Sequence, residues 1–106
     1  MLTIIETEVF EKFWPLYWME KEHDAFIAFI AESPNAGDVV SGSGGVRKVR
    51  WSRSGSGKSG GVRVIYFNRL ANGEIWLLLI YAKSKLDTVD GKILKEMKSE
   101  IEKTFE

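Results

Sequence analysis

The stretch that decides the fold is residues 42–67, GSGGVRKVRWSRSGSGKSGGVRVIYF. Its pattern predicts two β-strands joined by a glycine- and serine-rich hairpin loop, with the strands over 46–51 and 62–67. Because side chains alternate across a strand, Lys48 and Arg50 project from one face of the first strand and Val49 from the other. Arg63 projects away from the apolar face of the second strand. If the strands pair with their apolar faces together, Lys48, Arg50 and Arg63 converge on one surface.

The remainder of the chain predicts helices and two more strands around this hairpin. Residues 2–6 are expected to form a strand, and a helix capped by Thr7 follows, with a kink or break near Trp14 because Pro15 removes a backbone hydrogen bond. This helix carries one buried stripe, made of Val9, Phe10, Phe13, Trp14, Tyr17 and Trp18. A second helix ends near Ser33, just before a proline.

After the hairpin, Asn72 and Gly73 predict a tight turn, and residues 74–81 are apolar on both faces, as in a central strand. One face of this strand is available to the helices, and the other needs a partner or a ligand groove. Residues 89–105 predict a final helix. The order β-α-α-β-β-β-α predicts an α+β domain over 1–106, with a mostly antiparallel sheet of about four strands and helices on one face.

The net charge of zero hides an uneven distribution. Residues 1–40 carry two lysines against eight acids, residues 41–85 carry nine Lys or Arg against Glu74 alone, and residues 86–106 carry four lysines against six acids. A basic central segment in an otherwise acidic chain indicates a polyanion site or an acidic partner. The alternative interpretation is a solvated basic face.

Common cofactor and catalytic motifs are excluded by their surroundings. The GKS at 57–59 lacks the glycine five positions earlier, and a strand follows it instead of the phosphate-binding helix. The glycines at 42, 44 and 45 are turn residues, because Arg47 occupies the third glycine position of a dinucleotide fingerprint. With no cysteine and a single histidine, His23, the chain is expected to hold no metal and no cofactor. Trp51 and Trp76 are interpreted as core residues, with base stacking as the alternative.

The chemistry-bearing residues are therefore basic: Lys48, Arg50, Arg63, Lys83 and Lys85, with Lys58 on the hairpin loop. Clustered cations on a rigid sheet are suited to binding a phosphodiester and to stabilising charge that develops at phosphorus.

Four segments of the chain resemble the RelE/HigB superfamily of bacterial toxins, in particular its HigB-like, phage Gp49-like branch. They are PNAGDV at 34–39, GSGGVRKVRW at 42–51, GKSGGVRVIY at 57–66 and LLIYAK at 78–83. This resemblance implies a toxin of a type II toxin-antitoxin system, a ribosome-dependent mRNA interferase that inhibits translation. In the family's chemistry the ribose 2′-hydroxyl attacks the adjacent phosphate and expels the 5′-oxygen, without a metal.

The resemblance also implies roles for individual residues. Arg50 and Arg63 are expected to hold the scissile phosphate, Lys48 to act as general base, and Lys83 or Lys85 to protonate or screen the leaving oxygen. The expected RNA-binding residues are Arg47, Arg53, Lys58 and Lys85.

The expected partners are the ribosome, its mRNA and a HigA-like helix-turn-helix antitoxin, which alone would contact operator DNA. No membrane partner is expected, and the absence of cysteine and of a signal-like start predicts a cytoplasmic protein. Two alternatives remain, because fold does not determine function. They are a non-enzymatic gyrase inhibitor or binding module, and an inactive relative that only binds its antitoxin.

Overall fold

The fold is an α+β domain in a computed structural model that describes residues 2–51, 61–82 and 89–105. Five strands form one sheet in the order β1-β5-β4-β3-β2. The strands are β1 (Thr3–Glu6), β2 (Asp38–Val39), β3 (Arg47–Trp51), β4 (Val62–Arg69) and β5 (Glu74–Ala82). The helices are α1 (Glu8–Phe13), α2 (Glu20–Glu32) and α3 (Gly91–Phe105), with 3-10 turns η1 (Trp14–Leu16) and η2 (Leu70–Asn72). The predicted class and element order are confirmed, and the short β2 is an addition.

The sheet is mostly antiparallel, as the sequence predicted, but it includes one parallel pair and has five strands where about four were expected. β1 pairs with β5 in parallel, and the other three pairs, β5–β4, β4–β3 and β3–β2, are antiparallel. The parallel pair arises because α1 and α2 intervene between β1 and the rest of the sheet, so β1 joins the free side of β5. β5 is thus the internal strand that its apolar sequence predicts.

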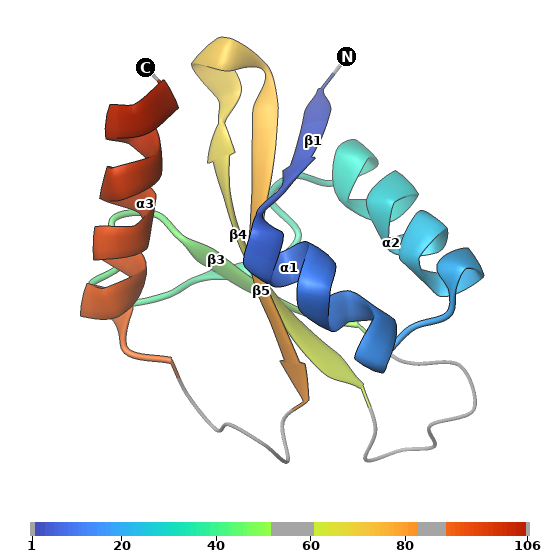
Figure 1. Cartoon of the computed structure of the whole chain (residues 1–106). Helices are drawn as coiled ribbons and strands as arrows, with labels where there is room; N and C mark the ends of the chain where they lie inside the picture. Colours follow the sequence, from blue (N-terminus) through green and yellow to red (C-terminus); the bar gives the residue numbers. More distant parts are fainter. Residues whose placement is uncertain (1, 52–60, 83–88, 106) are drawn as a thin grey trace.

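Helices cover both faces of the sheet, so the prediction of helices on one face is wrong. Figure 1 shows α3 on one side of the sheet, with α1 and α2 on the other. Phe10, Phe26 and Ile30 pack with Val64 and Leu77 on one face. On the opposite face Leu94 of α3 packs in a second buried cluster, which includes Ile65, Phe67, Trp76, Leu78 and Tyr81. β5 has apolar side chains on both faces, and α3 covers the face that was expected to need a partner.

The start of the helical segment follows the sequence prediction closely. The Thr7 side chain accepts a hydrogen bond from the backbone N–H of Phe10, and Pro15 lies in η1, where the α-helical pattern ends. The predicted buried stripe is only partly right. Phe10 and Trp18 are buried, but Val9 and Phe13 remain 42% and 38% exposed. Neighbouring positions point about 100° apart on a helix, and only one side of this helix is covered.

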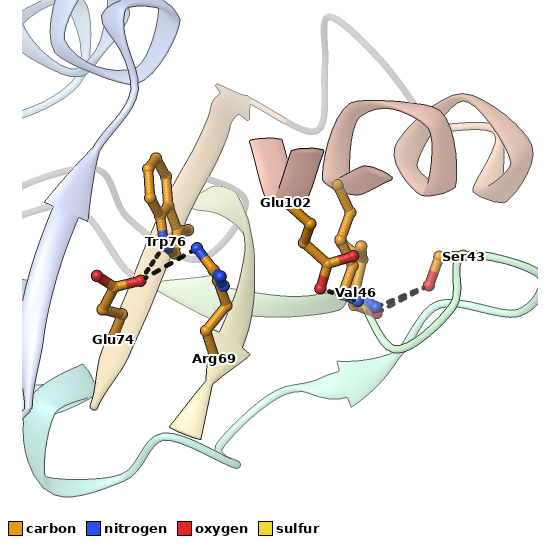
Figure 2. Close-up of polar contacts among 7 residues, drawn as sticks. Ser43, Val46, Arg69, Glu74, Trp76 and Glu102 are labelled. Carbon is orange, nitrogen blue, oxygen red and sulfur yellow. Dashed lines mark hydrogen bonds and ion pairs between the residues drawn. The ribbon is translucent and has the colours of Figure 1, made fainter. Parts of the chain in front are cut away.

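Glycines and polar contacts fix the turns on either side of the sheet's centre. Ser43 is completely buried, and its hydroxyl donates to the Val40 carbonyl and accepts from the Val46 N–H, a contact drawn in Figure 2. The glycines at 42, 44 and 45 have positive φ, as turn residues do. At the β4–β5 turn, Glu74 accepts hydrogen bonds from Arg69 and Trp76 (Figure 2).

Candidate functional site

Three basic side chains lie on one face of the sheet, as strand alternation predicts. In the antiparallel register of β3 and β4, Arg50 lies opposite Arg63 and Lys48 lies opposite Ile65. The alternate pair, Val49 and Val64, belongs to the cluster on the other face. Arg50 is exposed, whereas Lys48 and Arg63 are half-buried. We call Lys48, Arg50 and Arg63 the cationic patch.

The cationic patch has no charge partner among the described residues. None of its three side chains makes a hydrogen bond or an ion pair there, whereas Arg69 and Lys98 pair with Glu74 and Glu102. Like charges directly opposite each other on a sheet destabilise it, by about 0.2–1 kcal/mol. The Arg50–Arg63 pair therefore costs stability in the free chain, and a bound anion would relieve this cost.

An open groove of about 500 Å³ runs along the edge of β3 beside the cationic patch. It exists because β2 pairs with Arg47 and Lys48 alone, so that within the described ranges the outer edge of the rest of β3 has no neighbouring strand. The groove is lined by all three patch residues and by Phe29, Ala36, Gly37, Asp38 and Val49.

Asp38 was not a candidate in the sequence analysis, yet it is the acidic residue nearest to the patch in the sheet. The β2–β3 register places Asp38 opposite Lys48, on the same face. A carboxylate oxygen can act as a general base towards a hydroxyl beside it. The available sequence signal was the short apolar run after Asp38, followed by the glycine turn that folds it back onto β3.

The wall of this groove is held by a polar network on the opposite face of the sheet. The Tyr66 hydroxyl donates to the Pro34 carbonyl at 2.9 Å and accepts from the Gly37 N–H at 3.2 Å. Burial raises the pKa of Tyr66, so it remains a neutral donor. Gly37 approaches β3 so closely that a Cβ there would collide with the Lys48 carbonyl oxygen. The groove wall is thus a fixed part of the fold.

Arg47 belongs to this network and not to the cationic patch. It lies opposite Tyr66 in the register, and its guanidinium donates to the carbonyls of Gly37 at 2.6 Å and Asn35 at 3.3 Å. Through these two hydrogen bonds the Arg47 side chain holds the backbone of Asn35 and Gly37, which forms the groove wall, in place. Of the expected RNA-binding residues, Arg47 is therefore separated from the patch by the sheet.

A second cavity, of about 170 Å³, lies between the sheet and the start of α3. It is lined by Lys48, Ile65 and Tyr81 of the strands, by Val40 and Ser41, and by Val89, Gly91 and Leu94. Tyr81 lies opposite Arg63 in the β4–β5 register. Burial raises the pKa of Tyr81, and the nearby positive charge of Arg63 opposes the shift. Lys48 lines both the groove and this cavity.

Other candidate residues are placed elsewhere or not described. Arg53, Lys58, Lys83 and Lys85 lie outside the described residues, so their predicted roles stay predictions. Trp51 lies opposite Val62, on the patch-free face, where it packs against Phe26 and Phe29. His23 pairs with Glu6 at 2.8 Å and stacks on Trp14. Within residues 2–51, 61–82 and 89–105, no three His, Cys, Asp or Glu side chains are grouped to hold a metal ion.

A scan against models of known protein families finds no match to this chain. Among the helices in the described ranges, none has the length and apolar character needed to cross a membrane. The likeness to RelE/HigB toxins therefore rests on the sequence segments quoted above.

Proposed function

We propose that this protein is the toxin of a type II toxin-antitoxin system, an endoribonuclease that cleaves mRNA on the ribosome and so inhibits translation. The observation that carries the proposal is the cationic patch: three cations on one sheet face, beside an open groove, with no charge partner in the part of the chain that the structure describes. The sequence likeness to RelE/HigB toxins supports the same function, and it covers these same strands.

The reaction proposed is attack of a ribose 2′-hydroxyl on the adjacent phosphate, with departure of the 5′-oxygen and formation of a cyclic phosphate. Arg50 and Arg63 hold the non-bridging oxygens and stabilise the charge of the pentacoordinate phosphorus. Two side chains that lie opposite each other on the patch face of the sheet, Lys48 and Asp38, are candidates to accept the 2′-hydroxyl proton. The leaving oxygen takes its proton from Lys83 or Lys85 in this scheme.

The partners that go with this proposal are a helix-turn-helix antitoxin, which neutralises the toxin and alone contacts operator DNA, and the translating ribosome. The proposed location is the cytoplasm, where translation occurs.

Expression of the intact chain in bacteria tests the proposed function. Growth should stop and translated mRNAs should be cut, and Arg63→Met should relieve both effects. The matched control is Lys21→Met, which removes an exposed cation from α2 on the other face of the sheet.

Other outcomes would favour the alternatives. Growth arrest with intact mRNA and gyrase-dependent DNA breaks would favour a gyrase inhibitor. Tight binding to an antitoxin, with no growth phenotype for wild type or variants, would favour an inactive relative.

A further inference from the structure

The 500 Å³ groove along the edge of β3 is lined by residues from both faces of the sheet. Lys48, Arg50 and Arg63 line it from the patch face. Val49 belongs to the core cluster on the opposite face, and Phe29 of α2 packs against that cluster. The groove reaches both faces because, among the described strands, none covers the outer edge of β3 beyond Lys48. One ligand can therefore contact both faces by lying across this edge.

The charges in the groove direct an anion to one row of the sheet. Asp38 lies opposite Lys48, so this row carries one charge of each sign. Arg50 lies opposite Arg63, so the next row carries two positive charges. A carboxylate repels an anion, whereas a guanidinium can hold a phosphate by two parallel hydrogen bonds. A phosphodiester is therefore expected at the row of Arg50 and Arg63.

The end of the groove on the opposite face is apolar and aromatic. Phe29 is half-buried, and its ring packs against Trp51 with the ring centroids 4.8 Å apart. Phe29 lines the groove there together with Val49 and Ala36. An aromatic ring that is fixed by its neighbours and partly open to solvent can stack on a nucleic-acid base, and every base has a face for such stacking.

The two ends of the groove match the two parts of a nucleotide. A bare phosphate would use only the arginine row, and a purely apolar ligand would use only the end at Phe29. In RNA one ribose joins each phosphate to a base, so an anion and a flat ring lie a short distance apart. The groove volume of about 500 Å³ lies within the range of about 300–1,000 Å³ that is typical of small-molecule sites.

We propose that the groove binds one nucleotide of the RNA across the edge of β3, with its base stacked on Phe29 and the adjoining phosphate held by Arg50 and Arg63. The inference rests on the proposed function in taking RNA as the ligand. Phe29 is then a binding residue that takes no part in the proton transfers. Its stack holds the linkage at the arginine row with little dependence on the identity of the base.

Phe29→Leu tests this assignment, because it removes the aromatic face and keeps an apolar side chain. The probe is the dinucleotide adenylyl-(3′→5′)-adenosine with a 2′-O-methyl group beside its linkage, which lacks the attacking hydroxyl and is not cut. Its binding to the purified chain is followed through the NMR signals of its base protons. The wild type should bind it, and Phe29→Leu should bind it about fivefold or more weakly, as the loss of one base–aromatic stack predicts.

Salt dependence separates the two ends of the site. Arg63→Met removes a phosphate contact, so its effect on binding should shrink as the salt concentration rises. Phe29→Leu should weaken binding by the same factor at low and at high salt, because stacking involves no charge. Phe29→Tyr keeps the ring and should bind as the wild type does. Phe13→Leu is the matched control, since it makes the same change at an exposed phenylalanine of α1, and it should leave binding unaltered.

The outcomes distinguish this inference from the proposed function. Equal binding by wild type and Phe29→Leu, or an equal loss in Phe29→Leu and Phe29→Tyr, would overturn the stacking role even if the wild type cuts mRNA. A wild type that binds no dinucleotide, or that binds the acidic peptide tetraglutamate as tightly, would overturn the groove as a nucleotide site. Dinucleotide binding that depends on Phe29, without cleavage of mRNA, would support this site and refute the proposed function.

Discussion

Replacement of Arg63 by methionine should lower activity without lowering stability. Arg63 lies opposite Arg50, and neither side chain has a charge partner among the described residues. Methionine keeps most of the apolar stem, which is the half-buried part of the side chain, and removes the guanidinium. Relief of the like-charge pair should raise the free energy of unfolding by up to about 1 kcal/mol.

The same substitution removes a donor that acts on charge developing in the transition state. Loss of one such donor costs about 2.7–4 kcal/mol, which corresponds to a factor of about 10² to 10³ in rate. The opposite signs of the two effects are the useful signature, because a substitution that only damaged the fold would lower both quantities.

The assay measures single-turnover cleavage of mRNA in stalled ribosomal complexes, alongside urea unfolding of the same preparations. Lys21→Met, on α2, serves as the charge-matched control and should retain wild-type activity. A cleavage rate for Arg63→Met within about threefold of wild type would refute the assignment. So would an equal loss of rate in both variants, since that would indicate a general charge effect.

Three further predictions concern the groove wall and the buried tyrosines. Tyr66→Phe should destabilise the chain to urea by about 1–3 kcal/mol, since it leaves the Gly37 N–H without its acceptor, while the Pro34 carbonyl keeps the bond from Asn68; an unchanged midpoint would contradict this. Gly37→Ala should cost more than about 1 kcal/mol in the same assay, because its Cβ collides with the Lys48 carbonyl; wild-type stability would contradict the close approach. Burial raises the pKa of Tyr81 above the ordinary 10.0, so its contribution to stability is complete below pH 10 and is lost as the pH rises through the folded value. Tyr81→Phe should therefore lose less unfolding free energy than wild type between about pH 9 and pH 11, and parallel pH curves would count against this.

Local rules were sufficient for most elements of this fold. The Thr7 cap, the Pro15 break and the Gly73 turn each follow from one or two residues, and the structure has all three. Strand alternation was also sufficient to bring Lys48 and Arg63 to one face, because the apolar partners of each strand fix the pairing.

The features that were missed depend on contacts between distant segments. The apolar run of β5 shows that both of its faces are buried, but it does not specify that α3 covers the second face. The position of Asp38 beside Lys48 depends on a turn whose geometry is set by the buried Ser43 hydroxyl. In the sequence, Tyr81 is indistinguishable from the other apolar residues of β5, and only the structure shows that it lines the cavity under α3.

The most direct test of the account is to map the RNA ends formed when the purified chain acts on translating ribosomes. The proposed function predicts cuts within the codon in the ribosomal A site, upstream fragments that end in a 2′,3′-cyclic phosphate, and few such ends with Arg63→Met. Intact mRNA with the wild type, or the same ends at the same yield with Arg63→Met, would contradict the claim that the cationic patch grips and cleaves a phosphodiester linkage.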